Sequence, residues 1–185
     1  MVSLSALWLP IVLSAVLVFI ASSIMHMVLP YHRSDYQRLP DEEKVLAGLR
    51  AAGLNRGLYM FPFSTHKDMQ SPATTEKFKQ GPVGMLTIFP SGPVAMPKFL
   101  GMWFAYCLVI GFFVAYLTGR TVTPGAPYPA VFRVAGTAAF LTHGLGHLSN
   151  GIWRGQPWSV TLKEVFDGLI YALLTAGTFA WLWPH

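Results

Sequence analysis

Long runs without a single charged side chain constrain this sequence more than any other feature. Residues 4–29 contain no charge, and residues 99–119 form a second uncharged run that is closed by Arg120. A helix rises about 1.5 Å per residue, so each run can cross a hydrocarbon core of about 30 Å. Only 11% of the residues are charged, whereas soluble domains average about 25%. The sequence therefore predicts a membrane protein.

Two further apolar segments follow in the C-terminal part. Thr161 and Glu164 have the spacing of a capping box, which predicts a helix start there. We expect an all-α integral membrane protein with four transmembrane helices in a bundle. The expected segments are helix 1 at 1–30, a loop module at 31–98, helix 2 at 99–119, a short external turn at 120–130, helix 3 at 131–153, a turn at 154–163, and helix 4 with the C-terminus at 164–185. A cleaved signal peptide is the alternative for helix 1, but its apolar run exceeds the usual length of about 7–15 residues.

The loop module holds nine of the thirteen basic residues and six of the eight acidic ones. Pro40 and Asp41 favour a short helix that Gly53 ends, and Ser71-Pro72 favours a second helix that stops near Gly81. Residues 57–63 and 83–89 are strand-like in length and composition. They are expected to pair as a small hairpin or to dip into the membrane interface.

The distribution of basic residues predicts the orientation. Four spans would place eleven basic residues on the side of the loop module, against Arg120 and Arg133 on the other side. Because cytoplasmic segments carry the excess of Lys and Arg, we expect the loop module in the cytoplasm. Both termini would then lie on the non-cytoplasmic side of a bacterial-type inner membrane.

Small residues recur every four positions along two of the predicted spans, and such faces let membrane helices approach closely. They are Gly168, Ala172, Ala176 and Ala180 in helix 4, and Gly111, Ala115 and Gly119 in helix 2. The faces predict either a compact bundle, self-association or docking onto other membrane-protein helices. Besides these helices, the lipid bilayer is the expected partner. No nucleic-acid binding is expected, because the basic residues are spread along the loop rather than clustered.

Histidines supply the candidate site. His143 and His147 lie one turn apart on predicted helix 3, and two imidazoles on one helical face can ligate a metal ion. His26, His32 and Asp167 are expected at the same depth, with Glu164 nearby, so the set suits zinc, iron or copper, or a haem-type ligand. The alternatives are hydrogen bonding between helices and proton handling.

No catalytic residue stands out. The single Cys107 excludes a disulfide framework and a cysteine-based zinc site, and phosphate-binding glycine loops are absent. We therefore expect an accessory or structural subunit of a larger membrane complex, such as an energy-transducing one. The alternative is a membrane redox protein or enzyme that binds a metal or haem through histidines. A small oligomeric transporter is the third hypothesis.

Overall fold

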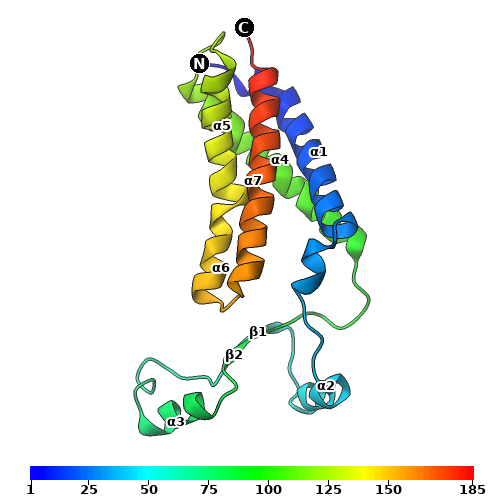
Figure 1. Ribbon diagram of the computed structural model, residues 1–185, viewed down its shortest axis with the longest axis vertical. Coiled ribbons are helices and arrows are strands. Elements are labelled where there is room, and N and C mark those ends of the chain that lie inside the picture. Colours follow the sequence, from blue (N-terminus) through cyan, green and yellow to red (C-terminus); the bar gives the residue numbers. More distant parts are fainter. The chain divides into compact units, whose positions relative to one another are not determined.

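The computed structural model describes all 185 residues, and the chain is mostly helical (Figure 1). It divides into two compact units. The first, here called the helical unit, comprises Met1–Asp35 and Ala95–His185. The second comprises Tyr36–Val94, which is narrower than the predicted range of 31–98, and it is called the loop module from here on. The main helices of the helical unit are α1 (Trp8–Ser23), α4 (Met96–Thr121), α5 (Tyr128–His143), α6 (Leu148–Trp153) and α7 (Trp158–Trp181). The loop module contains α2 (Glu42–Ala51), β1 (Gly57–Phe61), α3 (Pro72–Gln80) and β2 (Gly84–Ile88).

Two helical segments are long and apolar enough to cross a membrane. They are Leu4–Val28, which contains α1, and Met96–Thr121, which is α4. Only 28% of the most apolar part of each is buried within the chain. Large apolar side chains such as Ile20, Val109 and Phe113 are instead exposed. Contact with lipid would suit these exposed apolar side chains. Four helices of this kind were expected, and the structure has two.

Predicted helix 3 differs from expectation because it is not one continuous helix. α5 ends at His143, a short 3-10 turn covers Leu145–His147, and α6 follows. The break falls where α7 comes closest, since a Cβ atom on Gly168 would overlap the backbone of His143 and Gly144. His143 and His147 therefore do not share the face of a single regular helix.

Predicted helix 4 starts earlier than expected. α7 begins at Trp158, directly after Pro157, and the predicted capping box is wrong because Thr161 lies inside the helix with its hydroxyl buried. Its 24 residues correspond to about 36 Å, which is long enough to span. The helix contains three charged residues, however, namely Lys163, Glu164 and Asp167. It is not among the helices that are apolar enough by composition to span a membrane.

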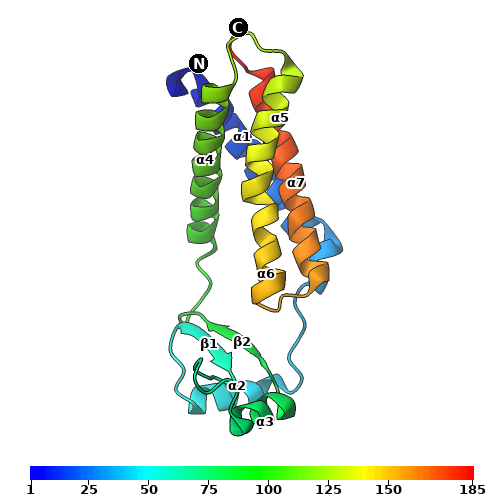
Figure 2. The same ribbon diagram turned by 90° about the vertical axis from the view of Figure 1, so that its left-hand side faces the viewer.

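The small-residue faces are used within the helical unit. All seven small residues of the two faces are buried. α5 and α7 lie side by side in both views (Figure 2), and a Cβ on Gly136 would meet that of Ala176 at 3.1 Å. Gly111 packs in the same way against Ile11 of α1. Phe179 of α7 is fully buried in the core that these contacts enclose.

The loop module follows its turn and capping signals closely. Ser71 caps α3 by accepting a hydrogen bond from the backbone amide of Thr74. α2 ends just before Gly53, whose φ of +64° favours glycine. β1 and β2 pair antiparallel from Gly57 opposite Ile88 to Phe61 opposite Gly84, so the predicted small sheet is confirmed.

Candidate functional site

Two nearby histidines and an aspartate that is distant in sequence meet at one end of the helical unit. His26 lies in the turn Ile24–Val28 after α1, His32 lies in the 3-10 turn Pro30–Ser34, and Asp167 lies in α7. One nitrogen or oxygen atom of each lies within 4.8 Å of the other two. The extended backbone of Leu29 separates these two segments. The imidazole of His32 stacks on that of His26 with 4.1 Å between ring centroids.

A single carboxylate oxygen joins the three groups. His32 Nε2 lies 2.8 Å from Asp167 Oδ2, and His26 Nε2 lies 3.4 Å from the same oxygen. The Asp167 side chain is only 4% exposed, while that of His26 is 51% exposed. The cluster is therefore closed on the α7 side and accessible on the His26 side.

Neighbouring residues hold the cluster in orientation. His32 Nδ1 lies 2.5 Å from Asp35 Oδ2, and the other oxygen of Asp35 accepts a hydrogen bond of 2.6 Å from Lys163 Nζ. The hydroxyl of Tyr31 donates to Asp167 Oδ1. The bonds to the cluster use His32 Nδ1 and Asp167 Oδ1. His32 Nε2 and Asp167 Oδ2 consequently contact each other, and Asp167 Oδ2 also contacts His26 Nε2.

The charges around His32 favour a positive charge at the cluster. Burial lowers the pKa of His32, but its hydrogen bonds to Asp35 and Asp167 outweigh burial and raise the pKa above its usual value. For Asp35, burial raises the pKa, and the hydrogen bonds from Lys163 and His32 outweigh it and lower the pKa. Burial, followed by the hydrogen bond to Asp167, raises the pKa of Tyr31. Tyr31 therefore remains a neutral hydrogen-bond donor.

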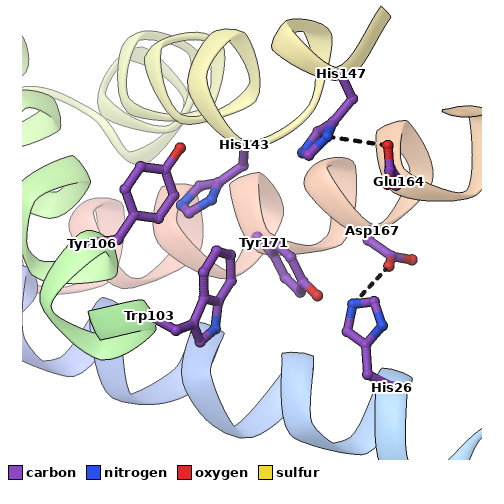
Figure 3. Close-up of a pocket in the computed structure, with 8 residues that line it drawn as sticks. All are labelled: His26, Trp103, Tyr106, His143, His147, Glu164, Asp167 and Tyr171. Carbon is purple, nitrogen blue, oxygen red and sulfur yellow. Dashed lines mark ion pairs between the residues drawn. The ribbon is translucent and has the colours of Figure 1, made fainter. Parts of the chain in front are cut away.

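A cavity of about 480 Å³ adjoins the cluster (Figure 3). Its lining residues are His26, Trp103, Tyr106, His143, His147, Glu164, Asp167 and Tyr171. The ring centroids of Trp103, Tyr106 and Tyr171 lie 6.4, 6.1 and 5.6 Å from that of His143. One end of the cavity is thus aromatic, and the other end carries the carboxylates and the remaining histidines.

The five residues predicted to bind a metal do not form one group. His26, His32 and Asp167 come together, whereas His147 pairs with Glu164 at 3.2 Å. His143 is 4% exposed among aromatic rings, and its Nδ1 has no hydrogen-bond partner. Both of these histidines line the cavity without joining the three-residue cluster.

Sequence reasoning missed the aromatic half of the cavity. Trp103 and Tyr106 come from α4, and Tyr171 follows Asp167 by one helical turn on α7. The spacing of four residues between Asp167 and Tyr171 could have placed Tyr171 beside the site, because side chains at i and i+4 share a helical face. The sequence gives no comparable signal for Trp103, which is positioned by a hydrogen bond of 2.9 Å from its indole nitrogen to Ser22 of α1.

The arrangement offers the chemistry of a metal centre. Two imidazole nitrogens and one carboxylate oxygen form a donor set that suits zinc or iron(II). The second candidate chemistry is hydrogen bonding alone, in which His32 bridges Asp35 and Asp167 as a structural link between α7 and the turn after α1. Comparison of the chain with protein-family models, curated proteins and solved structures finds no match.

Proposed function

We propose that this chain is an integral membrane protein that binds one divalent transition-metal ion, of the zinc or iron(II) class, through His26, His32 and Asp167. The proposal is carried by the convergence of three donor atoms within 4.8 Å of one another. Donors about 2.1 Å from a tetrahedral ion are separated by about 3.4 Å. The distance of 3.4 Å from His26 Nε2 to Asp167 Oδ2 matches this separation. The 2.8 Å between His32 Nε2 and the same oxygen is a hydrogen-bond length, and it would lengthen when an ion replaces the proton.

The residues behind the ligands support the same function. Histidines that bind metals usually donate their other ring nitrogen to a carboxylate or carbonyl, which fixes the ring and its tautomer. Asp35 occupies this position behind His32, and Lys163 in turn holds Asp35. Tyr31 has the equivalent role for Asp167.

The neighbouring cavity suggests that the ion would be reactive rather than structural. Structural zinc sites are closed by four protein ligands, whereas catalytic sites keep a position open for water or substrate. Here three protein ligands converge, and two of them, His26 and Asp167, also line the cavity. A molecule bound in the cavity would therefore reach the open position, and the metal would polarise it or activate a water molecule.

A four-span topology is part of this proposal. In addition to α1 and α4, we assign α5 with α6 as the third span and α7 as the fourth. The exposed apolar side chains of α7, including Phe166, Leu169 and Leu173, support lipid contact for this helix. Both ends of the chain lie at the same end of the helical unit (Figures 1 and 2), as an even number of spans requires. The excess of basic residues in the loop module favours a cytoplasmic position for it.

Metal quantification tests the proposal directly. The wild-type protein is extracted in mild detergent, reconstituted with zinc or iron(II), desalted and analysed by mass spectrometry of the elements. We expect about one ion per chain, and a loss of at least tenfold in affinity in His32→Ala. His66→Ala is the matched control because His66 belongs to the loop module and is not a member of the cluster. His143→Ala should also retain the metal.

Two results would contradict the metal proposal. One is wild-type protein that takes up neither ion under these conditions. The other is equal affinity in wild type and His32→Ala. A visible absorption band that disappears in His143→Ala would instead favour a haem-type ligand on that residue.

A subunit role in a larger membrane complex is the second candidate function. It is favoured by the exposed aromatic face of α4, where Phe112, Phe113 and Tyr116 are 45%, 60% and 49% exposed. The small-residue faces no longer support it, because they are buried within the chain. A particle mass equal to one chain plus detergent after mild extraction would count against this role.

A further inference from the structure

Two residues that line the same cavity each carry a buried polar atom with no hydrogen-bond partner. The two atoms are His143 Nδ1 and the hydroxyl oxygen of Tyr171. Both side chains belong to residues that are 4% exposed, and both residues line the cavity (Figure 3). Buried polar groups in folded proteins are nearly always paired, so unpaired ones call for a specific explanation. Two of them in one cavity point to a ligand.

The surroundings of these atoms define the shape of that ligand. The rings of Trp103, Tyr106 and Tyr171 surround His143 in edge-to-face orientations, with interplanar angles of 66°, 89° and 77°. The indole nitrogen of Trp103 is already bonded to Ser22, so this residue offers only its ring surface. Aromatic walls of this kind favour flat, unsaturated rings over flexible chains. The volume of about 480 Å³ is within the range of small-molecule sites.

We propose that the cavity binds a flat, membrane-soluble ring that carries carbonyl or hydroxyl oxygens, of the quinone or phenol class. The hydroxyl of Tyr171 donates a hydrogen bond to one ligand oxygen. His143 Nδ1 donates to or accepts from another oxygen, according to the imidazole tautomer. Both unpaired atoms thereby gain partners. This binding site rests on His143 and Tyr171 and does not require the metal ion.

A binding titration with menadione, a small quinone, tests this site. The full-length protein is freed of metal with a chelator, so that failure of the metal proposal leaves the result interpretable. Binding is followed by quenching of tryptophan fluorescence, because Trp103 lines the cavity. We expect saturable binding to wild type and an affinity about fivefold to tenfold lower in Tyr171→Phe, as the loss of one neutral hydrogen bond predicts.

Two variants make the titration specific. Tyr116→Phe is the matched control, because Tyr116 is an exposed tyrosine of α4 outside the cavity, and it should bind menadione like wild type. Tyr171→Phe removes a hydroxyl that has no partner in the protein, so its melting temperature should equal that of wild type. His143→Leu should weaken binding as well.

Three outcomes would overturn the proposal. The first is the absence of saturable quenching in wild type. The second is equal affinity in wild type, Tyr171→Phe and Tyr116→Phe. The third is displacement of bound menadione by dodecanol at a concentration no higher than that of menadione itself, because a flexible alcohol lacks the ring that the aromatic walls are proposed to select.

Discussion

Both ring nitrogens of His32 are engaged, and this distinguishes it from the other histidines of the chain. Its Nδ1 faces Asp35 and its Nε2 faces Asp167. A histidine held in this way has one ring orientation. An ion that binds to Nε2 takes the place of the proton on that nitrogen. In the proposed metal centre, Nε2 is therefore presented to the ion without a further loss of side-chain freedom.

Substitution of Asp35 tests this orienting role at the level of a single residue. Asp35→Asn keeps the size of the side chain but removes the charge that holds His32 Nδ1 and Lys163. Because partners behind metal ligands typically contribute 10-fold to 100-fold to metal affinity, we expect zinc affinity to fall by about that factor. A competition titration against a chromogenic chelator measures it.

Asp41→Asn provides the control for the loss of one negative charge. Asp41 is exposed in the loop module, and its side chain makes no capping hydrogen bond to α2. Its substitution should leave zinc affinity unchanged. An equal loss of affinity in both variants would mean that overall charge, rather than orientation of His32, determines binding.

The candidate residues were largely visible in the sequence, but their grouping was not. His26, His32 and Asp167 were expected at one depth of the membrane, and the structure brings them within 4.8 Å. The prediction that His143 and His147 share one helical face assumed an unbroken helix between them. Gly144 ends α5 at that point because α7 packs against its backbone, and this contact has no signature in the local sequence.

At the scale of elements, the approach of α5 and α7 positions the two halves of the cavity. Gly168 of α7 faces the backbone of His143 and Gly144 with no room for a side chain. The same contact places Tyr171, which lies one turn further along α7, beside the His143 imidazole. Close packing of two helices through glycine therefore sets the spacing of the aromatic wall.

Gly168→Ala tests this contact. The added methyl group meets backbone atoms rather than a movable side chain, so α5 and α7 must separate. Overpacking of this kind typically costs about 1–3 kcal/mol, which corresponds to a fall in melting temperature of roughly 2–10 °C for a chain of this size. Thermal unfolding in detergent, followed by circular dichroism, measures it.

Gly177→Ala is the matched control on the same helix. A methyl group there would lie 3.6 Å from the Tyr128 hydroxyl, which is an ordinary contact. Alanine also favours helix over glycine, so this variant should be at least as stable as wild type. Equal melting temperatures for the two variants would show that α7 does not depend on the close contact at Gly168.

The boundaries of helices and strands were predictable where capping residues or strand-like composition determine them. α3 begins after its Ser71 cap, and β1 and β2 pair as their composition suggested. The start of α7 was not predictable in this way. Thr161 and Glu164 have the spacing of a capping box, but they lie inside a helix that has already begun at Trp158. Glu164 accepts a hydrogen bond from Gln156 and pairs with His147 instead.

At the scale of the whole molecule, the proposed topology depends on whether α5 to α7 cross the membrane. α1 and α4 meet the requirements of length and composition by themselves. α7 carries charged residues in its first turns, but Asp167 and Lys163 are engaged in hydrogen bonds within the cluster. Pairing of this kind lowers the cost of charged groups near a membrane. We therefore expect α7 to be accommodated in the bilayer together with α5.

Labelling of single cysteines in intact bacterial cells distinguishes four spans from two. In a Cys107→Ala background, Arg154→Cys places a thiol in the exposed turn between α6 and α7, and His185→Cys places one at the C-terminus. If α7 spans, these two positions lie on opposite sides of the membrane. A membrane-impermeant maleimide should label His185→Cys and leave Arg154→Cys unlabelled until the cells are lysed.

Thr65→Cys in the loop module fixes the direction of the topology. Because basic residues concentrate in this module, the positive-inside rule predicts that Thr65→Cys is protected in intact cells like Arg154→Cys. Labelling of both Arg154→Cys and His185→Cys would restrict the spans to α1 and α4. Labelling of Thr65→Cys and Arg154→Cys with protection of His185→Cys would keep four spans but reverse their direction. Reversal would place the His26, His32 and Asp167 cluster at the external face, where its metal would come from outside the cell.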